Sequence, residues 1–419
     1  MTTSREQATP LASIPTISWV VLALMTADYV LGMIDRNAVA VLKTTLKQAF
    51  HINDSQYALL VTAFMVPYAI FYIICGRVVD RFGTRGPFTV FVGIWSVATI
   101  GCGLAGSFEQ LVFWRAILGA AEAGLLPVTI VALVNWFPKD RIAFAYAVKT
   151  PFQSLGAILS PPVVAFLALG FGWRAGFLVP GAVGLLFALL WFAFDRNQPY
   201  AGVGGVKPVR PRLIDVLRSR TLWGLMLVRL ITDPVWFFFQ YWQAGYMQER
   251  LGASLADVGQ LLWLPPLVTS VATFFTAGLT EKLARRGFDP AGGRMRVMQG
   301  TAILAPLIAT LPLIGGVPWF LAVVTTSYFM GFTWLYLSNI LITDLFPKEA
   351  VGTAIGIMSC VGTAGAALFN YAAGPIIDTY GYAPIFMTLA VLHPIGAVLL
   401  SLLYRERLHG SRVQQAHAA

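Results

Sequence analysis

The sequence predicts an all-α membrane protein in which twelve transmembrane helices form two related six-helix bundles. Of its 419 residues, 57% are hydrophobic and 11% are charged, whereas soluble domains carry about 25% charged residues. The two halves are also similar, because Phe137-Pro138-Lys139-Asp140 returns 209 residues later as Phe346-Pro347-Lys348-Glu349. At the same offset, Gly156, Gly172 and Phe177 return as Gly365, Gly381 and Phe386. A parallel duplication of six helices is typical of one class of transporter, whose site lies near the membrane midplane between the halves.

Apolar segments of membrane-spanning length recur along the whole chain. About 20 apolar residues cross a bilayer, and the sequence predicts spans at residues 17–42, 57–79, 87–106, 110–136, 141–168, 174–194, 221–248, 255–280, 295–314, 318–346, 350–376 and 383–404. Residues 195–220 contain several prolines and glycines and no apolar segment. We therefore expect an N-terminal bundle at 1–194, a cytoplasmic linker at 195–220 and a C-terminal bundle at 221–419.

The loop charges predict the orientation. Most of the 29 Lys and Arg residues fall in loops on the side of the N-terminus, and the opposite loops hold Lys43, Lys47, Arg174 and Arg250. Basic residues concentrate in cytoplasmic loops, so both termini of this multi-pass protein of the inner (plasma) membrane should be cytoplasmic. The same asymmetry explains the net charge of +10 without a nucleic-acid partner.

Charged residues interrupt the first predicted span. Asp28, Asp35 and Arg36 lie inside segment 17–42, where each charge costs about 2.5–3.5 kcal/mol at the bilayer centre. Asp28 and Asp35 are seven residues apart and share a helix face, and Arg36 can neutralise Asp35 in part. Such groups indicate a functional site facing a bundle interior or a wet cavity. The alternative is a structural ion pair that fixes helix packing.

The fourth predicted span carries a second pair. Arg115 and Glu122 are again seven residues apart on one face, among small residues that allow another helix to approach closely. A buried carboxylate beside an arginine that can move away is a candidate for proton uptake. A static ion pair is the alternative.

The loop between the second and third spans carries a spaced motif of glycines and charges. It comprises Gly76, Asp80, Arg81, Gly83 and Arg85. The glycines allow a tight turn, and Asp80 can cap the N-terminus of a neighbouring helix and so lock one conformation. With this GxxxDRxGxR spacing and a degraded copy at 278–287, the chain resembles the major facilitator superfamily.

Three further stretches of the first half narrow the resemblance. Ile34-Asp35-Arg36, the run from Arg115 to Pro127, and Asn135-Trp136-Phe137-Pro138 resemble the anion:cation symporter family. The stretch 233–242, and Asn339 followed by 344–347, resemble its bacterial hexuronate and galactonate transporters. The resemblance implies proton-coupled uptake of a small organic anion, a sugar acid or another mono- or dicarboxylate, by alternating access. By the same resemblance Asp35 and Glu122 take protons, Arg115 couples them and Arg36 meets the substrate carboxylate. The other substrate positions that it implies are Tyr68, Gln153, Tyr336, Ser338, Asn339 and Ser359.

Lys149 departs from the family pattern. It lies in the fifth predicted span, four residues before Gln153 and hence near it on one helix face. We predict that Lys149 binds a second acidic group of the substrate. The alternative is that it pairs with Asp28 or Asp35.

The sequence lacks the motifs of ATP-driven transporters and of common enzymes. The sequence has no GxxxxGK[ST] for ATP and no HExxH or nucleophile elbow for chemistry on a substrate, so we predict neither an enzyme nor a cofactor or metal. The expected partners are a small organic anion, protons and membrane lipid, with the protein as a monomer. One alternative is an organic-anion exchanger or facilitator without proton drive, which uptake under an imposed pH gradient would distinguish. A multidrug exporter, with an aromatic cavity that lacks paired cations, and a sensor with an added signalling domain are others.

Overall fold

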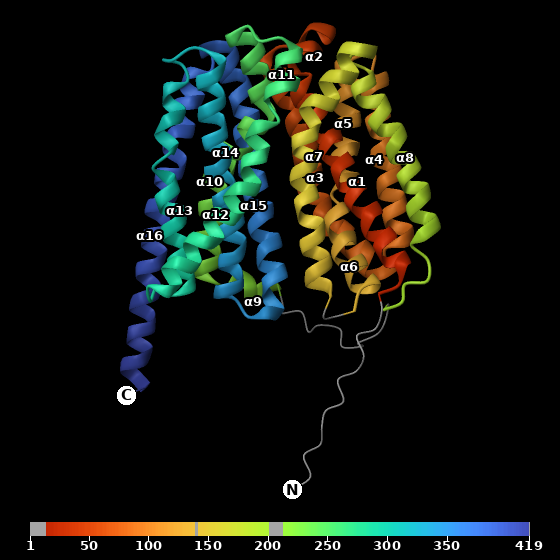
Figure 1. Cartoon of the computed structure of the whole chain (residues 1–419). Coiled ribbons are helices and arrows are strands. Elements are labelled where there is room, and N and C mark those ends of the chain that lie inside the picture. The colour runs from red at the N-terminus through yellow and green to blue at the C-terminus, as the bar shows by residue number, and fades with distance from the viewer. Residues whose placement is uncertain (1–13, 139–140, 201–212, 419) are drawn as a thin grey trace.

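The computed structural model describes residues 14–138, 141–200 and 213–418, and the regular structure in that part of the chain is helical (Figure 1). The first half contains α1 (Thr16–Val41), α2 (Lys43–Phe50), α3 (Asp54–Phe82), α4 (Arg85–Leu104), α5 (Phe108–Glu122), α6 (Leu125–Trp136), α7 (Ile142–Phe171) and α8 (Ala175–Phe194). The second contains α9 (Leu213–Leu217), α10 (Arg220–Leu251), α11 (Leu255–Leu261), α12 (Leu264–Arg285), α13 (Pro290–Ala302), η1 (Ala305–Thr310), α14 (Val317–Leu345), α15 (Lys348–Tyr380) and α16 (Ala383–Ala418). The prediction of an all-α polytopic membrane protein is confirmed.

Within the described residues, eleven segments are long and apolar enough to cross a membrane. The structure differs from the prediction at residues 295–314, where α13 ends at Ala302 and a separate 3-10 helix, η1, begins at Ala305. Pro306 lies in the first turn of η1, and proline cannot donate the hydrogen bond that would continue the α-helix. The 13 residues of α13 span only about 20 Å at ~1.5 Å per residue. This predicted span is therefore not one continuous helix.

The duplicated sequence has the same backbone in both halves. Phe137 ends α6 with φ −128° and ψ 144°, and Phe346 ends α14 with φ −123° and ψ 148°. Gly172 and Gly381 both have positive φ, at 86° and 72°, a region that glycine adopts without strain. The repeat is therefore structural as well as sequential.

A second pair of repeated glycines sets how closely helices pack. A Cβ atom at Gly156 in α7 would lie 2.8 Å from Met33 Cβ in α1, and one at Gly365 in α15 would lie 2.5 Å from the Leu230 carbonyl oxygen in α10. Both distances are shorter than van der Waals contact. Contacts of α7 with α1 and of α15 with α10 are thus equivalent pairings in the two halves.

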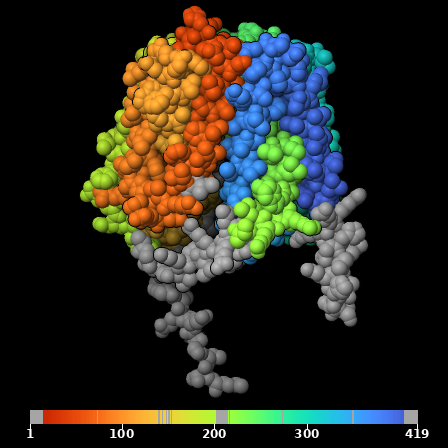
Figure 2. Space-filling view, turned by 180° about the vertical axis from the view of Figure 1, so that it is seen from behind, coloured from red at the N-terminus to blue at the C-terminus, as the bar shows by residue number. Residues whose placement is uncertain are grey.

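The two halves stand side by side (Figure 1). The termini end of the molecule is the end where α1 begins and α16 ends, and the remote end is the opposite one, where α2 and α11 lie. From behind, the orange surface of the first half and the blue surface of α15 and α16 meet along a seam (Figure 2). Helices α3 and α15 contact each other across this boundary.

The start of the predicted linker is hydrogen-bonded to the first half. Asp195 accepts hydrogen bonds of 2.6 Å from Thr84 Oγ1 and from Trp136 Nε1. Gln198 donates to the same carboxylate, and the backbone N–H of Tyr200 donates to the carbonyl oxygen of Asn135. Residues 201–212 of the predicted linker lie outside the described part of the chain.

Candidate functional site

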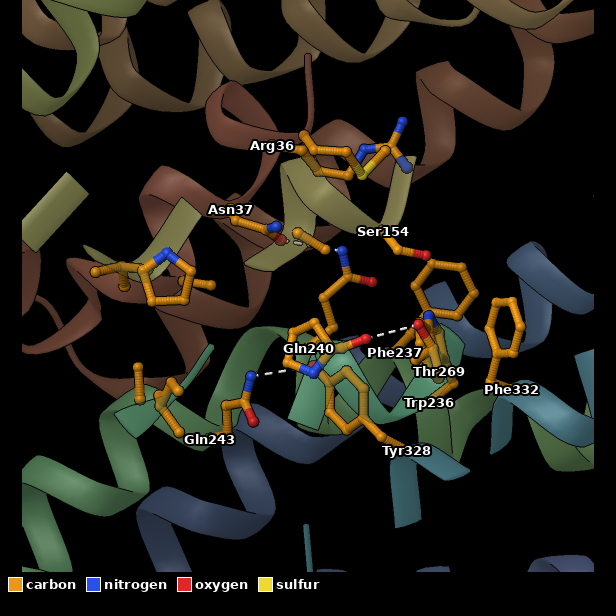
Figure 3. A pocket seen from close by; sticks show the side chains of 18 of the residues that line it. Arg36, Asn37, Ser154, Trp236, Phe237, Gln240, Gln243, Thr269, Tyr328 and Phe332 are labelled. Atoms are coloured by element: carbon orange, nitrogen blue, oxygen red, sulfur yellow. Dashed lines mark hydrogen bonds between the residues drawn. The ribbon is translucent and has the colours of Figure 1, made fainter. Parts of the chain in front are cut away.

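A cavity of about 220 Å³ lies between the two halves (Figure 3). Its walls come from α1 and α7 of the first half and from α10, α12 and α14 of the second. Most of the lining is apolar, and the charged side chain in it is Arg36 of α1. The other polar or amphipathic lining residues are Asn37, Ser154, Trp236, Gln240, Gln243, Thr269 and Tyr328.

Arg36 forms an ion pair with Glu122, which is the last residue of α5. Arg36 Nε and Nη2 donate hydrogen bonds of 3.1 and 2.6 Å to Glu122 Oε1. The guanidinium also lies over the rings of Tyr68 and Phe64, with its carbon 4.8 and 5.4 Å from the ring centroids. The Arg36 side chain is 14% exposed and that of Glu122 is 1% exposed. One arginine therefore both contacts the cavity and holds a buried carboxylate.

Arg115 has no such partner in this conformation. It is fully buried, its guanidinium carbon lies 4.5 Å from the centroid of Phe64, and its three side-chain nitrogens lack hydrogen bonds. The sequence placed Arg115 and Glu122 on one face of a single helix. The structure instead pairs Glu122 with Arg36, which reaches it from α1.

Asp35 and Asp28 are both buried in the first half. None of their four carboxylate oxygens accepts a hydrogen bond of good geometry, although the Thr99 side chain lies near Asp35. Asp35 lies within electrostatic range of Glu122 and Arg115, and Asp28 within range of Glu122. The expected neutralisation of Asp35 by neighbouring Arg36 is not seen, because consecutive side chains of a helix point about 100° apart.

Lys149 lies against an aromatic ring outside the cavity lining. Its Nζ is 3.8 Å from the centroid of Tyr29, and the lysine is buried. It bonds to neither Asp28 nor Asp35, whose oxygens accept no hydrogen bond of good geometry, so the alternative of such a pair is wrong for this conformation. Binding of a second acidic group by Lys149 stays a prediction.

The predicted residues of the second half lie beside the cavity rather than in its lining. Ser338 Oγ and Asn339 Oδ1 accept hydrogen bonds of 3.1 and 3.4 Å from Arg229. Arg229 in turn forms a 2.6 Å ion pair with Asp233. Tyr336 stacks on Phe332, which does line the cavity, and Ser359 is half-buried on α15. The side chain of Gln153 lies outside the described residues, and its neighbour Ser154 is in the lining.

Sequence reasoning missed the amides of the cavity. Gln240 Nε2 of α10 donates a 3.1 Å hydrogen bond to Asn37 Oδ1 of α1, and Gln243 Nε2 donates a 3.0 Å hydrogen bond to Tyr328 Oη of α14 (Figure 3). Polar amides inside an otherwise apolar span are the signal that could have found Gln240 and Gln243.

A polar network joins the halves at the remote end. Lys43, at the start of α2, is fully buried, and its Nζ lies 2.7 Å from Asp54 and 3.1 Å from Glu249 of α10. It also donates a 2.6 Å hydrogen bond to Tyr382 and lies 4.6 Å from the centroid of Trp242. Burial lowers the pKa of Lys43, while the two carboxylates act in the opposite direction.

The same end contains a helix cap supplied from the other half. Asp378 of α15 accepts hydrogen bonds from the backbone N–H groups of Asp54 and Ser55, at 2.9 and 2.8 Å, and from Ser55 Oγ at 2.5 Å. These donors form the first turn of α3, where an acidic side chain is stabilising. Gly374 allows the approach, since a Cβ there would lie 2.7 Å from Ala58 Cβ. Together with the Lys43 network, this cap closes the remote end.

The predicted lock motif lies at the termini end, where α3 ends and α4 begins. Gly83 ends α3 with a φ of 76°. Arg85 Nε donates a 2.9 Å hydrogen bond to the carbonyl oxygen of Phe192 at the end of α8, and Arg81 lies over Phe82. Asp80 is exposed, as expected for a residue at this surface. The role of Asp80 as a lock stays a prediction.

Comparisons with known proteins agree with this architecture. Residues 26–340 match the Major Facilitator Superfamily. The Hexuronate transporter of Escherichia coli (strain K12) is 28% identical over 92% of this chain and 93% of its own length. The Galacturonate transporter of Dickeya chrysanthemi is 30% identical over 60% of this chain and 78% of its own length. A solved structure of a bacterial homologue of the human lysosomal transporter Spinster, inward-facing and unoccupied, matches with a TM-score of 0.74. It is 20% identical over 93% of this chain and 95% of its own, which shows the fold alone.

Proposed function

The chain belongs to the major facilitator superfamily of secondary transporters, and we propose that it takes up a sugar acid or a similar small carboxylate together with protons. As a transporter of this family it is not an enzyme. The proposed substrate class is supported by the relatives, whose names specify hexuronate and galacturonate. The observation that carries the proposal is the dual position of Arg36, which lines the cavity and pairs with Glu122.

The Arg36–Glu122 pair supports a mechanism of ion-pair exchange. A guanidinium binds one carboxylate through two parallel hydrogen bonds, and both Nε and Nη2 of Arg36 are used by Glu122. A substrate carboxylate can take this Nε–Nη2 edge of the guanidinium once Glu122 releases it. Protonation of Glu122 removes its charge and permits the exchange, so the proton and the anion bind together.

Asp35 and Arg115 complete the proposed coupling centre. A buried charged carboxylate without a partner is costly, and Asp35 is buried without a hydrogen bond of good geometry. Arg115, equally buried and without hydrogen bonds, is the cation that a charged Asp35 or Glu122 would approach in another state. We therefore assign proton binding to Asp35 and Glu122, and coupling between them to Arg115.

The arrangement of the halves supports alternating access between two bundles, 1–194 and 221–419, joined by the linker 195–220. The remote end is closed by Lys43, Glu249 and Asp378. If both termini are cytoplasmic, as the loop charges predict, this conformation excludes the substrate from the outside of the inner membrane. Exchange of this closure for one at the termini end, around Asp80, would open the cavity outward. We propose that a single chain performs this cycle.

Uptake by proteoliposomes tests the function. Purified protein is reconstituted with both termini accessible from a defined side, and accumulation of labelled galacturonate is followed with and without an imposed pH gradient. We expect the gradient to drive accumulation in the wild type and to have no effect in Glu122→Gln or Asp35→Asn. Gradient-independent exchange in the wild type would instead identify an exchanger or facilitator. Transport of lipophilic cations but not galacturonate would identify a multidrug exporter.

A further inference from the structure

The second-half wall of the cavity is aromatic, and we propose that it selects ring-shaped carboxylates that carry hydroxyl groups over open-chain acids. Within the proposed function, on which this inference rests, Trp236 and Tyr328 form the surface for the ring and Gln243 reads one hydroxyl group. Arg36 lines the opposite, first-half side of the cavity (Figure 3). Trp236, Tyr328 and Gln243 are then the residues that determine specificity among sugar acids.

The aromatic surface is built from two helices. The rings of Trp236 in α10 and Tyr328 in α14 have centroids 4.7 Å apart, and Phe332, one turn further along α14, lies 5.8 Å from Trp236. All three line the cavity. Aromatic side chains offer a large, rigid apolar face. A pyranose ring presents a flat face of C–H groups that can cover such a surface, whereas a flexible open chain must be ordered before it can do so.

Gln243 supplies an unpartnered polar atom at the same wall. The residue is 7% exposed, its Nε2 donates to Tyr328 Oη, and its Oε1 has no hydrogen-bonding partner. A buried acceptor without a donor costs about 1–3 kcal/mol. A hydroxyl group of a bound ligand can donate to this oxygen and remove that penalty. The ligand therefore needs a hydroxyl group as well as a carboxylate.

The rest of the lining limits how many hydroxyl groups the cavity can satisfy. Apart from Arg36, the amides and the hydroxyl groups of Ser154 and Thr269, it is mostly apolar, with Met33, Val41, Leu262, Pro266 and Leu335 among its members. Hydroxyl groups that face such side chains lose hydrogen bonds to water without replacement. A ring keeps its hydroxyl groups at fixed directions, while an extended polyhydroxy acid spreads them along the apolar wall.

Calorimetric binding to the purified protein tests the inference with three ligands. Galacturonate has a ring and hydroxyl groups, galactonate has the hydroxyl groups on an open chain, and cyclohexanecarboxylate has a ring without hydroxyl groups. We expect the wild type to bind galacturonate at least tenfold more tightly than either of the others. Trp236→Leu should lose most of the preference for galacturonate over galactonate. Trp236→Phe, which keeps an aromatic ring, should retain part of that preference.

Gln243→Leu should weaken galacturonate about tenfold and leave cyclohexanecarboxylate unchanged, because only the former has a hydroxyl group for Oε1. Matched controls are Trp263→Leu and Gln248→Leu, which alter the same residue types outside the cavity lining. Melting temperatures identify variants that have not folded. Equal or tighter binding of galactonate by the wild type would overturn the inference while leaving the transport function intact. If no carboxylate binds, the proposed function fails as well.

Discussion

Four basic residues inside the predicted membrane spans can be compared in the structure, and Arg36 differs from the other three in its position relative to the cavity. Arg115 is fully buried, Lys149 lies on Tyr29, and Arg229 is held by Asp233. Arg36 alone among these four lines the cavity. Its ion-pair partner, Glu122, can be neutralised by a proton, so its donors can become available without a change in its own charge.

The first prediction compares Arg36 with a buried arginine outside the cavity. Arg36→Gln should weaken carboxylate binding about 10–100-fold, since hydrogen bonds to charged groups contribute about 1.5–3 kcal/mol. The control is Arg229→Gln combined with Asp233→Asn, which removes a buried pair without leaving one charge unpaired. Calorimetry at fixed pH measures both. Equal losses in the two variants would mean that Arg36 acts on binding only through the general fold.

Residue spacing along a helix predicted part of this site. Asp35, Arg36, Arg115 and Glu122 were found because charges inside an apolar span are costly, and all four are buried or line the cavity. Their expected pairing, Arg36 with Asp35 and Arg115 with Glu122, differs from that in the structure, where Arg36 pairs with Glu122. Spacing shows which side chains share a face of one helix, but Arg36 and Glu122 belong to helices that meet only in three dimensions.

At the scale of single helices, the repeated glycines set the closest crossings. Gly156→Ala and Gly365→Ala should each lower the stability by about 1–3 kcal/mol, the usual range for overpacking, because the added methyl groups meet α1 and α10. Gly170→Ala and Gly356→Ala are the controls on α7 and α15, since a Cβ at either position meets nothing within 4 Å. Thermal melting in detergent checks this. Melting temperatures as high as those of the controls would show that the crossings are not tightly packed.

The cap of α3 by Asp378 supports a prediction about closure. Asp378→Asn removes a charge from the first turn of α3, which contributes about 0.3–1 kcal/mol at an exposed position. It should shift the population toward states with an open remote end. Spin labels at the exposed residues Glu109 and Tyr380 report the separation of the halves there.

Asp257 provides the control for this prediction. It caps α11 at the same end, but its bonds are to Ser254 of its own helix. Asp257→Asn should therefore leave the label separation unchanged. A shift of the same size in both variants would assign the effect to general loosening of the remote end.

Helix boundaries were predictable where hydrophobicity changes, and less so where a helix breaks inside an apolar segment. Segment 110–136 is two helices, with the break directly after Glu122, at Ala123 and Gly124. A Cβ at Gly124 would lie 2.2 Å from the ring of Phe91, so α4 packs closely against the chain at this break. Pro306 could have indicated the other break, between α13 and η1, from the sequence alone.

For the whole molecule, closure at the two ends should be in competition. Asp80 at the termini end is predicted to stabilise the outward-open state, and Asp378 caps α3 in the present one. Asp80→Asn and Asp378→Asn should move the same label separation in opposite directions. Because the sites are at opposite ends of α3, the double variant should lie near the wild type, as expected for additive effects at distant sites. Shifts in one direction for both variants would contradict this competition.

The duplication and the two-bundle order follow from the sequence, whereas the conformation does not. The residues repeated at the offset of 209, such as Phe137 and Phe346, also have matching backbone angles. Which end is closed depends on contacts such as Lys43 with Glu249, and these residues are more than 200 positions apart. No local pattern in the sequence records such a contact.

The central claim is that a substrate carboxylate replaces a newly protonated Glu122 on Arg36. Calorimetry of galacturonate binding in two buffers of different ionisation enthalpy measures the protons taken up per ligand bound. The measurement is made at a pH at which Glu122 of the ligand-free protein is deprotonated. There, the wild type should take up about one proton more per galacturonate bound than Glu122→Gln does. The variant should also bind with less dependence on pH. Equal proton uptake by the wild type and Glu122→Gln, with the same pH dependence, would contradict the exchange on Arg36.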